Sequence, residues 1–197
     1  MTITRSRDYT IQQWDTEGHK IGPAYRGANA AFSPDGTHFV SWGMESTTIQ
    51  NSDSGAVITT ICTPNGSIKH CCFSPDDRFI AGASGFNAYI WDITGSKPCL
   101  IETIGHTNII LSLIFCSSLI SLSFDNSVKF WQIGTPSMDP VATDPGHIPF
   151  IPASIISIKL HTKDGIAISC DEDGVVRTWD TLTGLCKASI PQLDPLT

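Results

Sequence analysis

The segment Ser121–Gln132 reads SLSFDNSVKFWQ, and a related segment recurs along the chain at a nearly constant interval. The other copies span residues 4–15, 41–52, 81–92 and 169–180. Each copy is aligned on the tryptophan near its end, or on the residue in its place: Trp14, Asn51, Trp91, Trp131 and Trp179. These anchors lie 37, 40, 40 and 48 residues apart, and such a period indicates an array of repeated supersecondary units.

Each repeat predicts four short strands, as the third repeat shows. Strands are expected at residues 67–73, 78–83, 86–91 and 99–104. A turn is expected at Ser74–Asp77, where the proline fixes φ and an aspartate closes the turn locally. Related turn signals occur at Pro34–Gly36 and Lys163–Gly165, and no helical period persists over three turns. The chain is therefore predicted to be all-β.

Together these motifs resemble the WD-repeat β-propeller family, with repeats of fungal type, over essentially the whole chain. Phe-Ser-Pro-Asp turns stand at Phe32–Asp35 and Phe73–Asp76, and Trp-Asp endings close the first, third and fifth copies. The resemblance implies one propeller domain of about five blades, each of four antiparallel strands. The blades are expected to span residues 1–26, 27–66, 67–107, 108–153 and 154–197.

The first copy begins on what would be the second strand of a blade. The first blade is therefore predicted to lack its first strand, which implies an open arc or an imperfectly closed ring. Three interpretations follow: a truncated gene product, a fragment of a longer seven-blade protein, or a propeller closed by a partner chain. The fragment is favoured, and the uncapped end blades would also allow self-association.

The resemblance further implies a buried hydrogen-bond network in the better-formed blades. It links a histidine after glycine, a strand serine, a turn aspartate and the tryptophan. The fourth unit offers His106, Ser121 or Ser123, Asp125 and Trp131, and the fifth offers His147, Ser169, Asp173 and Trp179. An aspartate can accept from the imidazole and from turn amides, while a buried indole N–H needs an acceptor. Units two and three depart from this pattern and are expected to depend mainly on apolar packing.

A histidine, an aspartate and a serine together also suggest a catalytic site. Repetition argues against that interpretation, because an enzyme needs one site rather than one per blade, and geometry defines a triad. The chain also lacks a Gly-rich phosphate loop, a His-Glu-x-x-His motif and a Gly-x-Ser-x-Gly motif. No catalytic residue, cofactor or metal site is therefore predicted.

Charge and cysteine content narrow the choice of partner and compartment. A net charge of −7 argues against nucleic acid or an anionic membrane as the main partner. The seven cysteines form no Cys-x-x-Cys pair and mostly lie in apolar runs. They are interpreted as small buried hydrophobic residues of a reducing compartment, which predicts an intracellular protein, cytoplasmic or nuclear.

Two regions are candidates for binding a protein or peptide. The resemblance implies a binding face that carries the turns between second and third strands and the loops between blades. Its candidate contact residues are Arg7, Trp42, Met44, Phe86, Phe124 and Glu172, although scattered exposed apolar residues are also normal. The proline-rich segment Gly134–Ser154 is the second candidate, and a tolerated surface loop is favoured there.

The function predicted from the sequence is a non-enzymatic scaffold or sensor module for protein interactions. Two alternatives stay open. One is a fragment of a larger signalling receptor propeller of the NACHT type, and the other is a subunit of an enzyme complex, such as a ubiquitin-ligase substrate receptor.

Overall fold

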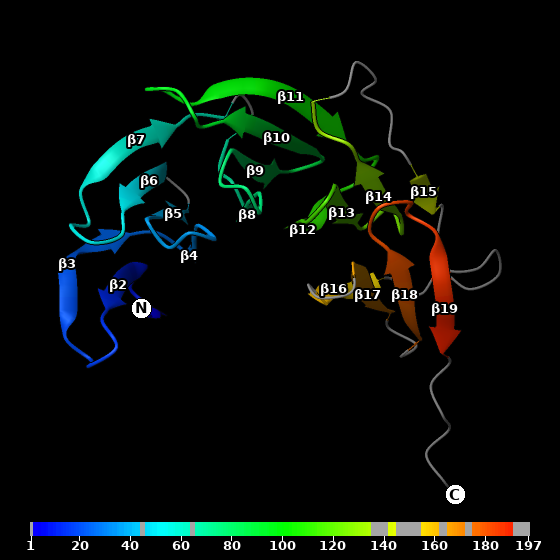
Figure 1. Cartoon of the computed structure of the whole chain (residues 1–197), viewed down its shortest axis with the longest axis horizontal. Helices are drawn as coiled ribbons and strands as arrows, with labels where there is room; N and C mark the ends of the chain where they lie inside the picture. The colour runs from blue at the N-terminus through cyan, green and yellow to red at the C-terminus, as the bar shows by residue number, and fades with distance from the viewer. Residues whose placement is uncertain are drawn as a thin grey trace, which may run out of the picture. The chain divides into compact units, whose positions relative to one another are not determined.

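The computed structural model describes residues 2–43, 46–63, 66–134, 142–144, 155–161, 165–171 and 175–190. These residues form strands and turns (Figure 1), and none of them belongs to a helix that could cross a membrane. The chain divides into two compact units, Met1–Thr103 and Ile104–Thr197, and each is described by itself.

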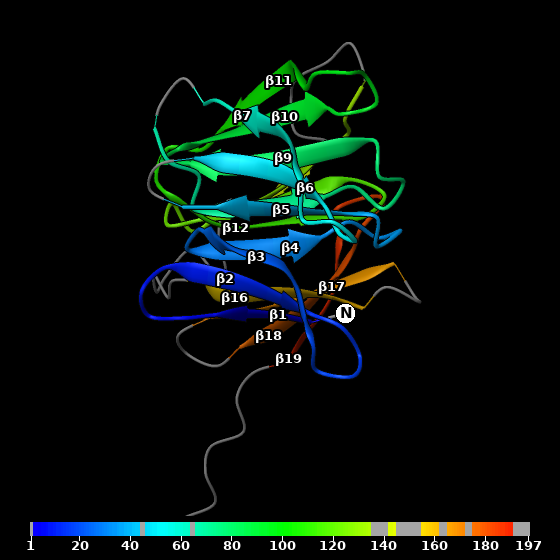
Figure 2. The ribbon, with the colours of Figure 1, turned by 90° about the vertical axis from the view of Figure 1, so that its left-hand side faces the viewer.

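The first unit contains three antiparallel sheets. The first has the order β1 (Thr2–Arg5), β2 (Thr10–Trp14), β3 (Lys20–Arg26). The second has the order β4 (Asn29–Phe32), β5 (His38–Trp42), β6 (Thr47–Asn51), β7 (Val57–Ile61), and Figure 2 shows β5 next to β4. The third consists of β8 (His70–Phe73), β9 (Phe79–Ser84), β10 (Asn87–Asp92) and β11 (Cys99–Gly105).

The second unit contains two sheets of four strands. One has the order β12 (Ile110–Phe115), β13 (Leu119–Ser123), β14 (Val128–Trp131), β15 (Ala142–Asp144). The other has the order β16 (Ile155–His161), β17 (Ile166–Asp171), β18 (Val176–Asp180), β19 (Cys186–Ile190). The predicted fold class is confirmed, since the described strands form four-stranded antiparallel sheets after a first sheet of three.

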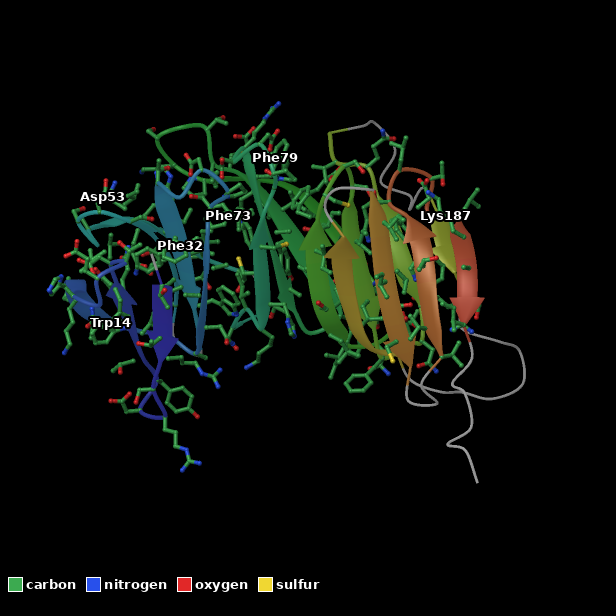
Figure 3. The ribbon with its side chains drawn as sticks, turned by 60° about the horizontal axis from the view of Figure 1, so that its bottom comes forward. Trp14, Phe32, Asp53, Phe73, Phe79 and Lys187 are labelled. Carbon is green, nitrogen blue, oxygen red and sulfur yellow. The ribbon has the colours of Figure 1, made fainter. Side chains whose placement is uncertain are left out.

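The two Ser-Pro-Asp turns have the same internal hydrogen bonds. Ser33 Oγ donates to Asp35 at 2.6 Å and accepts from the His38 amide at 2.9 Å. Ser74 Oγ donates to Asp76 at 2.6 Å and accepts from the Phe79 amide at 2.8 Å. The phenylalanines that precede these turns are labelled in Figure 3. The two copies of the turn therefore share the same side-chain hydrogen bonds as well as the same sequence.

The core of each unit lies between the faces of successive sheets. In the first unit, Val40 and Ile49 of the second sheet belong to the same buried cluster as Trp91 of the third. In the second unit, Phe130 of β14 packs against Trp179 of β18, with ring centroids 6.1 Å apart. Strand alternation accounts for this arrangement, because it gives each inner strand one face toward each neighbouring sheet.

The register of the second repeat differs from the sequence alignment by one residue. Trp131 donates to Ser121 and Trp179 donates to Ser169, and in the second sheet Gln50 donates to Ser41 at 3.2 Å. Gln50 therefore occupies the tryptophan position. Asn51 instead accepts from two amides of the following turn, as Asp180 does after Trp179. The sequence alignment placed Asn51 at the tryptophan position and was wrong there.

The expectation that the cysteines are buried is wrong for most of them. Cys71 is buried, whereas Cys62, Cys99 and Cys186 are exposed. Cys99 and Cys186 begin the outer strands β11 and β19, which have a neighbouring strand on one side only. All seven cysteines lie among the described residues, and none of them forms a disulfide.

Candidate functional site

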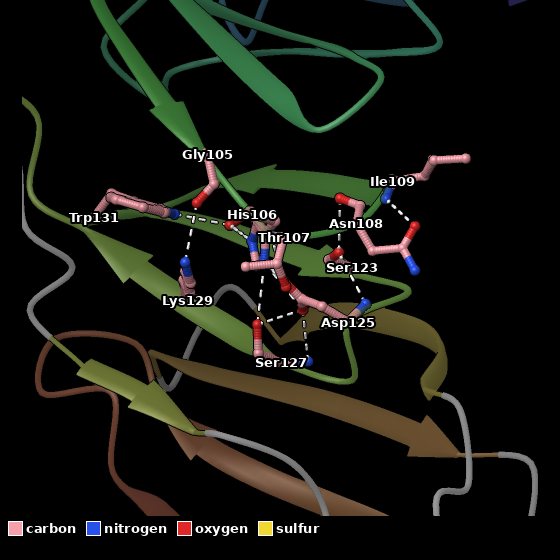
Figure 4. A network of polar contacts seen from close by, with 11 residues as sticks. Gly105, His106, Thr107, Asn108, Ile109, Ser123, Asp125, Ser127, Lys129 and Trp131 are labelled. Carbon is pink, nitrogen blue, oxygen red and sulfur yellow. Dashed lines mark hydrogen bonds and ion pairs between the residues drawn. The ribbon is translucent and has the colours of Figure 1, made fainter.

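A buried polar network joins three segments of the fourth repeat (Figure 4). His106 Nδ1 lies 3.0 Å from Asp125 Oδ2, and His106 Nε2 lies 2.7 Å from Ser121 Oγ. The Trp131 indole N–H donates to the same Ser121 oxygen at 2.7 Å. A neutral imidazole protonated on Nδ1 satisfies all these groups, because it donates to the carboxylate and accepts from the serine hydroxyl.

Asp125 joins the turn between β13 and β14 to the loop before β12. Its carboxylate accepts from the Thr107 amide at 2.9 Å, from the Ser127 amide at 3.0 Å and from the Ser127 hydroxyl at 2.6 Å. Ser123, which the sequence offered as an alternative network serine, makes different bonds. It accepts from the Asp125 amide and donates to the Asn108 carbonyl, both at 3.1 Å. The Asp125 carboxylate and the Ser123 hydroxyl therefore each join the turn to the loop.

Burial and hydrogen bonding shift the pKa values of this network in a consistent way. Burial lowers the pKa of His106 below 6.5, although the Asp125 carboxylate acts in the opposite direction. Burial alone would raise the pKa of Asp125, but hydrogen bonds from Ser127, Thr107 and His106 together hold it well below 3.8. The resting state is therefore a neutral imidazole beside a carboxylate.

The network in the fifth repeat is described only in part. The Trp179 indole donates to Ser169 Oγ at 2.9 Å, and both residues are buried. His147 and Asp173 lie outside the described residues. The first repeat contains the equivalent hydrogen bond between an indole donor and a hydroxyl acceptor, since the Trp14 indole donates to Thr4 Oγ1 at 2.7 Å.

Sequence reasoning missed two members of the network, Thr107 and Ser127. Ser127 stands two residues after Asp125, so its hydroxyl and amide can both reach the carboxylate from within one turn. That Asp-x-Ser spacing was the available signal. Thr107 follows His106 directly, which places its amide beside the same carboxylate.

The network carries an exposed pair of apolar side chains. The Phe124 amide donates to the Ile109 carbonyl at 2.9 Å, so the turn and the loop are also joined through their backbones. Phe124 is 49% exposed and Ile109 is 45% exposed. We call these two residues the Phe124–Ile109 pair. Sequence reasoning selected Phe124 and missed Ile109, although Ile109 lies on a loop of the expected binding face.

The other candidate contact residues have different surroundings. Arg7 is exposed, and Phe86 is 50% exposed in the tight turn between β9 and β10. Trp42 is only 7% exposed, and its indole N–H donates to the Lys69 carbonyl at 3.0 Å. The expectation that Trp42 contributes to an exposed rim is therefore wrong, because its side chain packs toward the third sheet. Met44 and Glu172 lie outside the described residues.

One pocket of about 250 Å³ lies in the first unit, beside Gly43 and Ile61. Its walls contain the hydroxyls of Thr47, Thr60 and Ser67 and the exposed thiol of Cys62. Among its described lining residues there is no carboxylate, imidazole or ammonium group. The described lining therefore offers hydroxyl and thiol groups as hydrogen-bond partners.

The comparisons with known proteins agree with the repeated geometry. The family described as "WD domain, G-beta repeat" matches residues 55–92 and 138–180. The chain is 32% identical, over 146 residues, to the target of rapamycin complex subunit wat1 of Schizosaccharomyces pombe. This chain carries WD repeats. The wat1 match covers 72% of this chain and 44% of wat1.

Further similar proteins match over shorter stretches. This WD-repeat chain is 37% identical over 65 residues to a Denticleless protein homolog of Danio rerio, covering 30% of this chain and 10% of that protein. The chain thus spans less than half of the length of these curated relatives. The crystal structure of a computationally designed protein, Ika8, superposes with a TM-score of 0.76 at 20% identity. It covers 95% of this chain and 57% of the designed chain, and it supports the β-propeller fold alone.

Proposed function

We propose that this chain is a non-enzymatic scaffold that binds a protein or peptide, with the Phe124–Ile109 pair at the centre of the contact. The observation that carries the proposal is the exposure of two apolar side chains on a turn and a loop that a buried network joins. Anchors that are already ordered lose little conformational entropy when a partner binds them.

The network supports this proposal against a catalytic role. Ser121 is 0% exposed and His106 is 8% exposed, so a substrate has little access to either. The Ser121 oxygen already accepts the Trp131 N–H, and the imidazole is already placed between Ser121 and Asp125. These groups hold the blade together, and burial together with the indole hydrogen bond keeps the Ser121 oxygen from an incoming carbonyl.

The named relatives support membership of a larger assembly. By its name, wat1 is a subunit of the target of rapamycin complex. By analogy, this chain would act as one subunit that brings proteins together rather than as an isolated catalyst. A net charge of −7 favours a protein partner over nucleic acid or an anionic membrane. The seven cysteines without a disulfide fit an intracellular location, cytoplasmic or nuclear.

Affinity capture with quantitative mass spectrometry tests the binding role. Wild type is compared with Phe124→Ala and Ile109→Ala, and Leu182→Ala is the matched control because Leu182 is 70% exposed away from this turn. We expect one set of proteins to be lost from both test variants and kept by the control. Equal capture by all four proteins would contradict the proposed contact. Since the variants change exposed side chains, equal melting temperatures would show that folding is preserved.

A further inference from the structure

The two ends of the buried network in the fourth repeat fix the direction of every hydrogen bond between them. The Trp131 indole can only donate, and the Asp125 carboxylate can only accept. The Ser121 hydroxyl accepts from Trp131 and therefore donates to His106 Nε2, at 2.7 Å. His106 in turn donates through Nδ1 to Asp125 at 3.0 Å (Figure 4). The network thus has one arrangement of protons, in which the imidazole is neutral.

A second proton on His106 does not fit this arrangement. It would lie on Nε2, which already accepts the Ser121 hydroxyl. Ser121 would then receive two N–H donors and would have to turn its own O–H away. Ser121 is 0% exposed, and its hydroxyl has no further partner among the residues that the structure describes. In the closed network, protonation therefore leaves a buried donor unpaired, which costs free energy.

Two charged groups of the described residues act on the imidazole, in opposite directions. The Asp125 carboxylate, on the turn between β13 and β14, favours an imidazolium, and the Lys129 ammonium on β14 disfavours it. Lys129 Nζ donates to the carbonyl of Gly105, directly before His106, at 2.9 Å. The other side chains that contact the imidazole are uncharged and belong to Ser121, Ser127 and Trp131. The His106 side chain is 0% exposed, and its burial lowers its pKa.

The same network holds the Phe124–Ile109 pair together. Asp125, which follows Phe124, accepts from the Thr107 amide on the loop that carries Ile109. The Phe124 amide donates to the Ile109 carbonyl at 2.9 Å. Thr107 and Ile109 are exposed, whereas Ile120 of the same sheet is 0% exposed in the apolar cluster. The turn and the loop can therefore separate while the apolar core of the sheet stays packed.

We propose that protonation of His106 separates the Phe124–Ile109 pair, so that this surface is formed near neutral pH and is lost in mild acid. The protonated imidazole leaves its place between Ser121 and Asp125, and the loop moves away from the turn. The open form binds the extra proton more tightly, because water reaches the ring there, so acid shifts the population toward it. The use of this surface for binding rests on the proposed function, whereas the opening itself does not.

Amide hydrogen exchange of the isolated full chain, resolved by NMR, tests the opening. Protection factors, which correct for the intrinsic pH dependence of exchange, are compared at about pH 7.5 and about pH 5.5. Uptake of one proton changes the opening equilibrium by at most about tenfold per pH unit, so we expect the protection of the Phe124 amide to fall by about threefold to tenfold. The Cys116 amide is the internal control, since its bond to the Ser118 carbonyl lies at the other end of the β12–β13 hairpin, and its protection should not change.

Three variants assign the loss of protection to His106. His106→Gln has no titrating group there, so the protection of its Phe124 amide should be equal at the two pH values. Lys129→Gln keeps His106 and its partners, and it should lose protection at a higher pH than wild type, because Lys129 disfavours the imidazolium. It carries the test if His106→Gln does not fold. His19→Gln should behave as wild type, since the side chain of His19 is 72% exposed.

Two results would overturn the proposal. One is a Phe124 protection factor that acid leaves unchanged in wild type or lowers equally in His106→Gln. The other is equal protection of the Phe124 and Ile120 amides, because the pair would then open only when the whole sheet unfolds. No partner is present in this experiment, so its outcome does not depend on the proposed function. Capture at neutral pH with Phe124→Ala tests that function separately, and either one can fail without the other.

Discussion

The amide of Gln50 donates to the hydroxyl of Ser41 at 3.2 Å, in the same place where Trp131 donates to Ser121 and Trp179 donates to Ser169. A glutamine thus replaces the repeat tryptophan as a donor in the second sheet. It also donates to Thr48 at 2.7 Å, while its other amide atom, Oε1, is buried and has no described hydrogen-bond partner. The repeat bond is preserved there, but one polar atom is left unsatisfied.

Gln50→Met is expected to change the free energy of unfolding by less than about 1 kcal/mol, and a small stabilisation would fit equally well. The substitution removes the unsatisfied oxygen, and the hydroxyls of Ser41 and Thr48 still bond to each other at 3.0 Å. Urea denaturation provides the measurement. A loss above about 2 kcal/mol would show that the amide contributes more than these contacts indicate.

The sequence predicted the fold through its periodic tryptophans and Ser-Pro-Asp turns, because those residues determine strand ends and turns locally. The sequence missed the role of Gln50, because the spacing of the repeat aligned Asn51 with the tryptophan. The strand register of the second sheet places Gln50 there instead. That register depends on the pairing of Phe39 with Gln50, which no local motif specifies. The pairing of β5 with β6 therefore determines which residue takes the tryptophan position, and the spacing of the repeat does not.

The sequence predicted only those residues of the candidate site that belong to the motif of the repeat. His106, Asp125 and Trp131 follow from a motif, and the structure brings them together around Ser121. The burial of Trp42 was not predictable from its own strand, β5. The Lys69 carbonyl that accepts its N–H directly precedes β8 of the third sheet. Similarly, Ile109 is paired with Phe124 by a backbone bond between two separate loops.

Asp125→Ala is expected to lower the free energy of unfolding by more than about 2 kcal/mol, because His106 and two amides lose a largely buried acceptor. Asp53→Ala is the control: Asp53 is an exposed turn residue, and its loss should change stability by at most about 0.5 kcal/mol. Thermal or urea denaturation compares them. Equal stability of the two variants would contradict the structural role of the network.

Gly82→Ser tests whether the repeat pattern or the local packing decides stability in the third sheet. The pattern favours a hydroxyl there, as an acceptor for Trp91. A Cβ atom at Gly82 would, however, lie 2.7 Å from Ile68 Cδ1 and 3.1 Å from Trp91 Cζ3. We therefore expect a destabilisation of about 1–3 kcal/mol from overpacking. This cost should exceed the gain from replacing a glycine inside a strand, where glycine loses more conformational entropy on folding than other residues. Gly95→Ala, with its nearest neighbour at 3.6 Å, should be tolerated; stabilisation by Gly82→Ser would refute the packing argument.

The stability of the second unit should decrease as the solution is acidified below pH 6.5. The pKa of His106 is lowered in the folded protein from 6.5, because burial disfavours the imidazolium more than Asp125 favours it. The unfolded chain therefore binds more protons between the folded pKa and 6.5, so this contribution is complete above 6.5 and is lost on going down through that window. Asp125 adds a second loss at lower pH, since its pKa is depressed below 3.8.

Urea midpoints measured at about pH 7.5 and about pH 5.5 report the histidine contribution. His106→Gln should be less stable than wild type at the higher pH and should lose less stability on acidification, because the titrating group is gone. Any acid sensitivity of the first unit should remain, since burial also lowers the pKa of His70 there. His19→Gln is the control, because the side chain of His19 is 72% exposed, and it should show the wild-type decrease. An unchanged decrease in His106→Gln would assign the acid sensitivity to groups outside the network.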